Sequence, residues 1–181
     1  MKRVVIGIAA AACVAALSTS AFAQTPVVSA QNPYTAAAKV QFDMIKANLA
    51  KTAAKVGEEN YSFKPTPDVR SLGEILGHVA DANFMICSAA AGEKPPQGGF
   101  EKKAAKADIV KGLNDSIAYC DKVIASMDDA KGAVTAQFFT GPTPKLAIIN
   151  FNVGHCNEHY GNLVTYMRLK GIVPPSSEPS K

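Results

Sequence analysis

Apolar residues recur at spacings of three and four along four stretches of the chain, which is the period of an amphipathic α-helix. These stretches cover residues 33–56, 71–92, 107–127 and 143–170. Pro33 suits a first helical turn, and Ser71 with Glu74 can form a capping box. No run of alternating apolar and polar residues is long enough to predict a strand. The pattern therefore predicts an all-α protein, folded as a four-helix bundle.

The connections between the predicted helices limit the topology. Residues 57–70 and 92–106 form two long links of roughly 14 residues, each able to span over 40 Å when extended. A helix of about 20 residues is only about 30 Å long. Either link can therefore cross the whole bundle, so the second and third helices can run parallel.

The fourth predicted helix carries polar residues on one face, beside an apolar face. The polar positions follow spacings of four and three and are Asn152, His155, His159 and Asn162. Such a helix suits the wall of an internal cleft. Asn152 and Asn162 are therefore candidate substrate-binding residues, although the same amides could instead hydrogen-bond across the bundle.

Two other lines on this helix carry expectations of their own. Small residues stand at Ala147, Gly154 and Gly161, and we expect a neighbouring helix to come close along this line. Cys156 points about 100° away from His155, into the apolar face. We expect it to be a buried, unreactive thiol.

The chain has three histidines, and their spacing indicates a metal site. His155 and His159 lie one helical turn apart and can reach the same ion, with His78 on the second helix as a third ligand. Neutral imidazoles suit Zn, Ni, Cu and Fe, and three protein ligands leave a position for water or substrate. The alternative is three histidines that only hydrogen-bond within a bundle.

Three carboxylates flank the histidines in sequence. Glu74 lies one turn before His78, Asp81 lies three residues after it, and Glu158 stands between the other two histidines. Each is a candidate catalytic base or a residue that orients a ligand. The alternative for each is a solvated surface group.

The N-terminus has the pattern of a secretory signal peptide over residues 1–23. Lys2 and Arg3 precede an apolar run, which ends in Ala21-Phe22-Ala23. We expect residues 24–175 to form a single domain and the Pro/Ser-rich residues 176–181 to be a disordered tail. The expected location is periplasmic or secreted.

The charge balance narrows the class of partner. The chain has 19 Lys and Arg against 15 Asp and Glu, and without Lys2 and Arg3 the net charge is about +2. This excess is too small to predict binding to nucleic acid, and no later stretch is long enough for a membrane span. A small-molecule substrate is expected, and a homodimer is left open.

Three segments carry a resemblance to a known family. They are Tyr61 to His78, His155 to Leu163, and Tyr166 to Pro175. They contain a histidine in the second helix, a His-x-x-x-His pair in the fourth and a Gly-x-x-Pro-Pro exit. The sequence from about 33 to 175 resembles the DinB/YfiT-like superfamily.

The resemblance implies an up-down-down-up four-helix bundle with a divalent metal ion, zinc or nickel, on three histidines. Carried over to this chain, the ligands are His78, His155 and His159. The resemblance does not imply one reaction, because members include thiol-dependent transferases and isomerases, hydrolases and proteins of unknown activity.

Helices two and three run parallel in this topology, and two cysteines then come to similar heights. Cys87 and Cys120 would differ by roughly 4 to 5 Å along the bundle, which allows a disulfide in an exported protein. An antiparallel pair of helices would separate them by about three turns. The alternative is two unrelated buried thiols.

Two functions follow from these features. The first is a metal-dependent hydrolase or transferase, and the second is a non-catalytic metal-binding or structural bundle of the cell envelope. Residues 155–159 also read H-x-x-E-H, a motif of inverted zinc peptidases. Those enzymes need a further acidic ligand downstream, and only Glu178 follows here, so the sequence argues against a peptidase.

Overall fold

The computed structural model describes residues 31–179, so the predicted signal peptide lies outside the described residues. The helices are α1 (Pro33–Lys55), α2 (Leu72–Ala91), α3 (Lys106–Ala125), α4 (Asp129–Ala133) and α5 (Lys145–Leu169). The strands are β1 (Thr135–Phe138) and β2 (Gly141–Pro144), and the 3₁₀ turns are η1 (Glu58–Asn60), η2 (Phe100–Lys102) and η3 (Pro175–Ser177). The four long helices are those predicted from the apolar periodicity.

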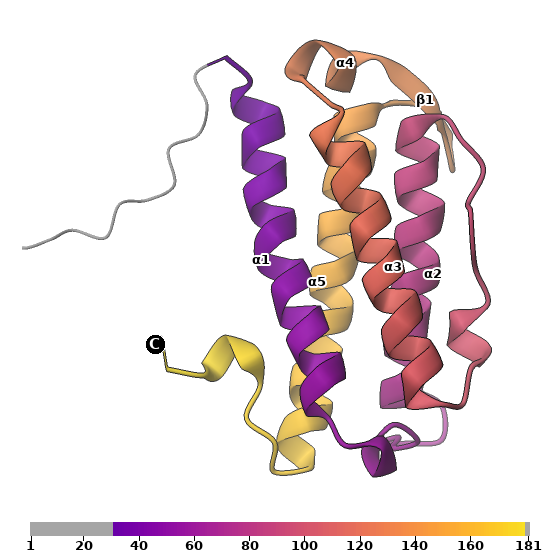
Figure 1. Ribbon diagram of the computed structural model, residues 1–181, viewed down its shortest axis with the longest axis vertical. Coiled ribbons are helices and arrows are strands. Elements are labelled where there is room, and N and C mark those ends of the chain that lie inside the picture. The colour runs from indigo at the N-terminus through magenta and orange to yellow at the C-terminus, as the bar shows by residue number, and fades with distance from the viewer. Residues whose placement is uncertain (1–30, 180–181) are drawn as a thin grey trace, which may run out of the picture.

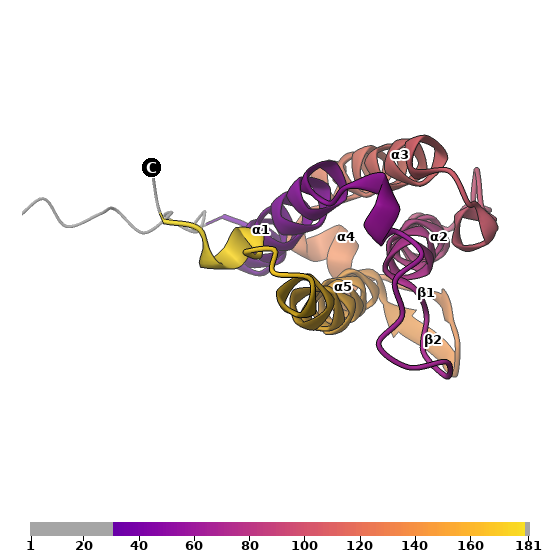
Figure 2. The same ribbon diagram turned by 90° about the horizontal axis from the view of Figure 1, so that it is seen from below.

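The four long helices form the bundle. α1 and α5 run in one direction and α2 and α3 in the other, and the connection 92–105 returns along the bundle to start α3 beside the start of α2 (Figure 1). Seen along the axis, α2 lies between α3 and α5, and α1 lies between the same two helices on the opposite side (Figure 2). α2 and α5 are therefore neighbours, which places His78 within reach of the other two histidines.

The ends of α2 are set by local sequence. The Ser71 hydroxyl accepts a hydrogen bond from the backbone N–H of Glu74 at 3.2 Å, and the Glu74 carboxylate accepts one from the backbone N–H of Ser71 at 2.6 Å. The helix stops at Gly92, whose φ of 81° suits a residue without a Cβ. The predicted capping box is thus present and fixes the start of the helix that carries His78.

The core is made by the apolar stripes of these helices. Its largest fully buried side chains include Phe42, Leu49, Leu72, Leu76, Phe84, Ile86, Leu113, Leu163 and Met167. Burial of this apolar surface is the main favourable term in the folding free energy. Among the residues that the structure describes, no helix is both long and apolar enough to span a membrane.

A β-hairpin precedes α5, although no strand was expected. β1 and β2 pair antiparallel, with Thr135 opposite Pro144 and Phe138 opposite Gly141. Each strand has only four residues, and the second contains Pro142 and Pro144, which cannot donate to a strand ladder. The helix was expected from about Thr143 but begins at Lys145, because Thr143 precedes Pro144, which disfavours helical backbone, and pairs with Ala136 in the hairpin.

Two smaller expectations also differ from the structure. Gly154 and Gly161 do not face a neighbouring helix, because a Cβ at either position would meet nothing within 4 Å. Residues up to Pro179 have a defined path in place of the disorder expected from 176, while 180 and 181 lie outside the described residues. In this tail Ser176 hydrogen-bonds to the Tyr160 hydroxyl, and Glu178 forms an ion pair with Lys55 at 2.7 Å.

The open surroundings of Gly154 lead to a prediction on stability. Gly154→Ala should raise the free energy of unfolding by about 0.5–1 kcal/mol, because alanine loses less backbone entropy in a helix and nothing here obstructs its methyl group. Urea denaturation of both proteins measures the change. A loss of stability would show that another group covers this face of α5 in solution.

Candidate metal centre

The three histidines converge on one point between α2 and α5. Nε2 of His155 lies 3.2 Å from Nε2 of His78 and 3.1 Å from Nε2 of His159. One ring nitrogen from each residue lies within 4.8 Å of the others, a spacing that could hold a metal ion. The i, i+4 spacing on α5 and the α2–α5 contact together produce this arrangement.

The chemistry of the nitrogen atoms fits a cation. A neutral imidazole carries one N–H, and Nδ1 of His78 faces the carboxylate of Glu101 at 3.0 Å, so its hydrogen belongs there. Nε2 of His78 then holds a lone pair that faces Nε2 of His155. A hydrogen on Nε2 of His155 could be donated to Nε2 of His78 or to Nε2 of His159, but not to both, so one of the two close nitrogen pairs would lack a hydrogen bond. A metal ion among the three Nε2 atoms would satisfy all three lone pairs.

Burial favours the neutral form of two of these imidazoles, His155 and His159. Burial is the largest of the effects that, together with the nearby His155 and His78, lower the pKa of His159 to about 4. Burial also lowers the pKa of His155, with a second contribution from His78. Both side chains are therefore uncharged at neutral pH, which is the state that binds metal.

Glu101 is part of this site, although the sequence did not point to it. Its Oε2 contacts His78 and its Oε1 accepts a hydrogen bond from Nε of Arg70 at 2.8 Å. Partial burial raises the pKa of Glu101, but the hydrogen bonds from Arg70 and His78 outweigh this effect and lower it overall. The residue lies in η2, within a connection that has no hydrophobic period, so no sequence signal marked it.

The three candidate carboxylates are placed differently from one another. Asp81 accepts hydrogen bonds from the backbone N–H groups of Phe100 and Glu101, so it holds the connection and not a substrate. Glu158 is exposed on α5. Glu74 completes its capping box, lies 3.1 Å from Nζ of Lys64 and lines the cleft beside the histidines.

This cleft has a volume of about 780 Å³ and opens on His159. Its walls are the segment from Lys64 to Arg70, together with Glu74, Ile75, Glu101, His159, Asn162 and Tyr166. The Tyr166 hydroxyl donates to the backbone carbonyl of Arg70 at 2.9 Å and ties that segment to α5. Asn162 thus lies where a substrate could reach it.

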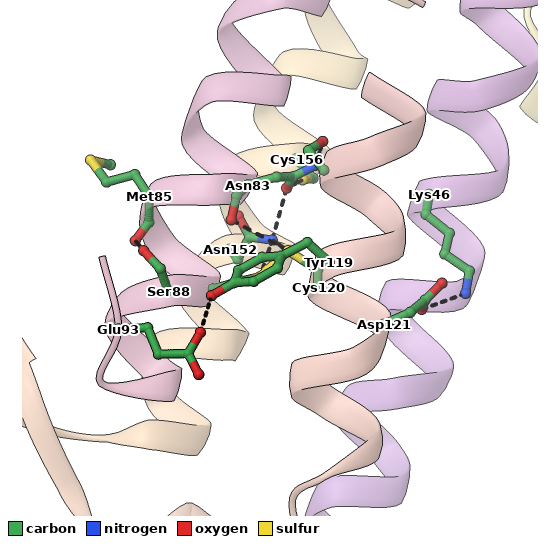
Figure 3. The surroundings of a disulfide bond; sticks show 12 residues. Lys46, Asn83, Met85, Ser88, Glu93, Tyr119, Cys120, Asp121, Asn152 and Cys156 are labelled. Carbon is green, nitrogen blue, oxygen red and sulfur yellow. Dashed lines mark hydrogen bonds and ion pairs between the residues drawn. A yellow bond between two sulfur atoms is a disulfide. The ribbon is translucent and has the colours of Figure 1, made fainter. Parts of the chain in front are cut away.

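Asn152 lies elsewhere, in the core. It is 1% exposed, its Nδ2 donates to Oδ1 of Asn83 at 2.9 Å, and the sulfurs of Cys87 and Cys120 lie 3.7 and 3.8 Å from that nitrogen. Figure 3 shows Asn83, Asn152 and Cys156 gathered beside Cys120. Asn152 is therefore not placed to contact a substrate, as one reading of the sequence expected. Its amide instead makes a hydrogen bond across the bundle.

The same region holds the cysteines. Cys87 and Cys120 are joined by a disulfide with their Cα atoms 5.4 Å apart, which is the pair expected for parallel helices. Cys156 is free and buried, and burial raises the pKa of its thiol to about 12. It donates to Oδ1 of Asn83 at 3.3 Å and is not a metal ligand.

The DinB superfamily model matches residues 41–163 of this sequence, which is more than half of the chain and includes all three histidines. The chain belongs to the DinB superfamily. No curated protein matches the sequence significantly.

Solved structures show the same fold at low sequence identity. A DinB-like protein from Bacillus cereus ATCC 10987 has 18% identity and a TM-score of 0.69, with 76% of this chain and 93% of that chain covered. A conserved protein from Enterococcus faecalis has 15% identity and a TM-score of 0.61, with coverage of 75% and 95%. The helical bundle of this DinB superfamily member is therefore shared with these proteins.

Proposed function

We propose that this DinB superfamily member is a metal-dependent enzyme, hydrolase-like or transferase-like, acting on a small molecule. The observation that carries the proposal is the position of His159, which belongs to the histidine cluster and also lines the cleft. An ion held there would face the space in which a substrate binds. This arrangement is typical of catalytic sites, in which three protein ligands leave a coordination position free.

Different residues would bind the ion and form the wall of the cleft beside it. His78, His155 and His159 hold it, and the segment from Lys64 to Arg70 forms the outer wall of the cleft. When bound, the ion supplies Lewis acidity to an oxygen atom of the substrate. Three nitrogen donors suit zinc or nickel, and we propose one of these as the native metal.

Of the three carboxylates proposed from the sequence as candidate bases, Glu74 is the one that lines the cleft. Hydrogen bonds from the backbone of Ser71 and from Lys64 lower the pKa of Glu74, so it is ionised at neutral pH. An ionised carboxylate on the cleft wall can accept a proton from a nucleophile or orient it.

This role can be separated from helix capping by a matched pair of variants. Ser71→Ala breaks the capping box and should cost about 1 kcal/mol of stability, whereas Glu74→Gln keeps a side-chain oxygen that can accept the hydrogen bond from the backbone of Ser71. Glu74→Gln alone should lower kcat, by roughly 10²-fold or more. Equal activity in the two variants, with metal content unchanged, would remove Glu74 from the mechanism.

The second candidate function is a metal-binding bundle without turnover. It would share the histidine cluster, but it gives no role to the cleft that opens on His159. The zinc-peptidase alternative loses support, because Glu178, the one acidic residue after the motif, pairs with Lys55 and does not join the histidines.

We also propose that the protein is exported to the periplasm or secreted. The signal-peptide pattern of residues 1–23 supports this location, and a disulfide is typical of oxidising compartments. Cleavage after Ala23 in the natural host, measured by N-terminal sequencing of protein from the extracellular or periplasmic fraction, tests it.

Metal analysis followed by an activity screen tests the enzymatic proposal. The protein is purified without added metal or chelator, and elemental analysis should find about one zinc or nickel per chain. Hydrolase and thiol-transferase substrates are then screened with loaded protein, stripped protein and His155→Ala. Turnover that follows metal content supports the enzyme, whereas bound metal with no turnover across both substrate classes favours the non-catalytic bundle.

A further inference from the structure

The connection between α2 and α3 is fastened to α2 at the level of His78. The carboxylate of Asp81 accepts hydrogen bonds from the backbone N–H groups of Phe100 and Glu101, at 2.9 and 3.0 Å. Asp81 lies three residues after His78, on nearly the same face of the helix. The backbone of the connection is therefore held beside this histidine.

Two glycines allow this close approach. Gly77 faces the backbone of Phe100, and a Cβ there would overlap the Phe100 carbonyl. Gly112 of α3 faces the Phe100 ring, where a Cβ would also overlap, and the ring stacks on Phe84 with centroids 6.1 Å apart. Packing and hydrogen bonds together fix the position from which the Glu101 side chain departs.

The Glu101 carboxylate is held at both oxygens. Arg70 donates to Oε1 at 2.8 Å, and Nδ1 of His78 lies 3.0 Å from Oε2. His155 and His159 have no such support, because within residues 31–179 their buried Nδ1 atoms have no hydrogen-bond partner. His78 is thus the histidine of the cluster whose outer nitrogen meets a carboxylate.

We propose that Glu101 is a positioning residue that sets the tautomer and ring orientation of His78. An ionised carboxylate only accepts hydrogen bonds, so it keeps the proton of the neutral imidazole on Nδ1 and leaves the lone pair of Nε2 facing His155. The effect on the ring exists without metal. Its consequence for metal affinity rests on the proposed function, because outer carboxylates strengthen the ligands they contact.

The test uses Glu101→Ala and Glu101→Gln, with Glu93→Gln as control. Glu93 lies in the same connection and accepts a hydrogen bond from the Tyr119 hydroxyl, on the surface and outside the cluster. The first readout is the ¹⁵N chemical shifts of the His78 ring in metal-free protein at mildly alkaline pH. We expect protonated Nδ1 in the wild type and control, and a shift toward protonated Nε2 in Glu101→Ala.

The second readout is the Kd for Zn²⁺, measured by calorimetry. Both Glu101 variants should bind about 10–100-fold more weakly than the wild type, and the control should be unchanged. Asp81→Asn keeps the Glu101 side chain but weakens the hydrogen bonds that hold the backbone of Glu101. Its Kd for Zn²⁺ should therefore lie between that of the wild type and that of the Glu101 variants. Wild-type tautomer and wild-type affinity in Glu101→Ala would overturn the proposal.

The two proposals fail in different ways. A wild-type protein that binds no Zn²⁺ or Ni²⁺ would contradict the metal centre, while the ring tautomer would still test the role of Glu101. If a Glu101 variant does not fold, Asp81→Asn supplies the same two readouts, and an unchanged tautomer together with unchanged affinity there would count against the proposal.

Discussion

His159→Ala should abolish the rise in melting temperature that zinc or nickel produces in the wild-type protein. An ion bound between α2 and α5 stabilises the folded state by mass action, by about 4 kcal/mol at a thousandfold excess over Kd. For a domain of this size, that corresponds to an increase of roughly 8–16 °C. The variant retains only one ligand on each helix and loses this increment.

The comparison has to be made against each variant's own metal-free melting temperature. His159 is 7% exposed, so alanine also removes some packing. Asn162→Ala, three residues further along α5 and also on the cleft wall, is the matched control and should keep the full metal-induced rise. An equal rise in His159→Ala would show that His159 is not a ligand.

Removal of the Cys87–Cys120 disulfide should have the other large effect. The bridge closes a loop with a sequence separation of 33, and the chain-entropy description gives about 3–4 kcal/mol of stabilisation for a loop of this length. We expect the Cys87→Ala/Cys120→Ala double variant to lose this amount in urea denaturation. Adding reductant should lower the stability of the wild type and leave the double variant unchanged.

Thiol counting checks the pairing directly. The denatured, unreduced mature chain should contain one free thiol, from Cys156, and Cys156→Ser should contain none. Three free thiols in the wild type would rule the bridge out.

The long helices and the pairing of His155 with His159 could be predicted because their causes are local. Apolar spacing sets the helices, and the one-turn separation of His155 and His159 brings them together wherever the helix lies. The capping box at Ser71 was readable for the same reason. His78 was predicted as the third ligand because it is the one other histidine of the chain. Its meeting with this pair requires α2 to pack on α5, which the family resemblance implied and the periodicity did not.

The rest depends on contacts between distant segments. Glu101 lies beside His78 because Asp81 binds the backbone of the connection and Gly77 leaves room for it. No local sequence pattern indicates either contact. Asp81 itself was read as a candidate base because of its distance along the helix from His78, whereas its carboxylate turns to the connection. Asn152 shares a face with the histidines, but its height on α5 places it against Asn83 in the core.

The disulfide gives the connection that carries Glu101 an unusual covalent setting. Residues 87–120 form a closed ring, and the whole segment 92–105 lies inside it. A single cut of the backbone in that segment would therefore leave one covalent molecule, with the cut ends still attached to α2 and α3. The fragments would separate only after reduction, so the histidine of α2 would stay tethered to the rest of the bundle even in nicked protein.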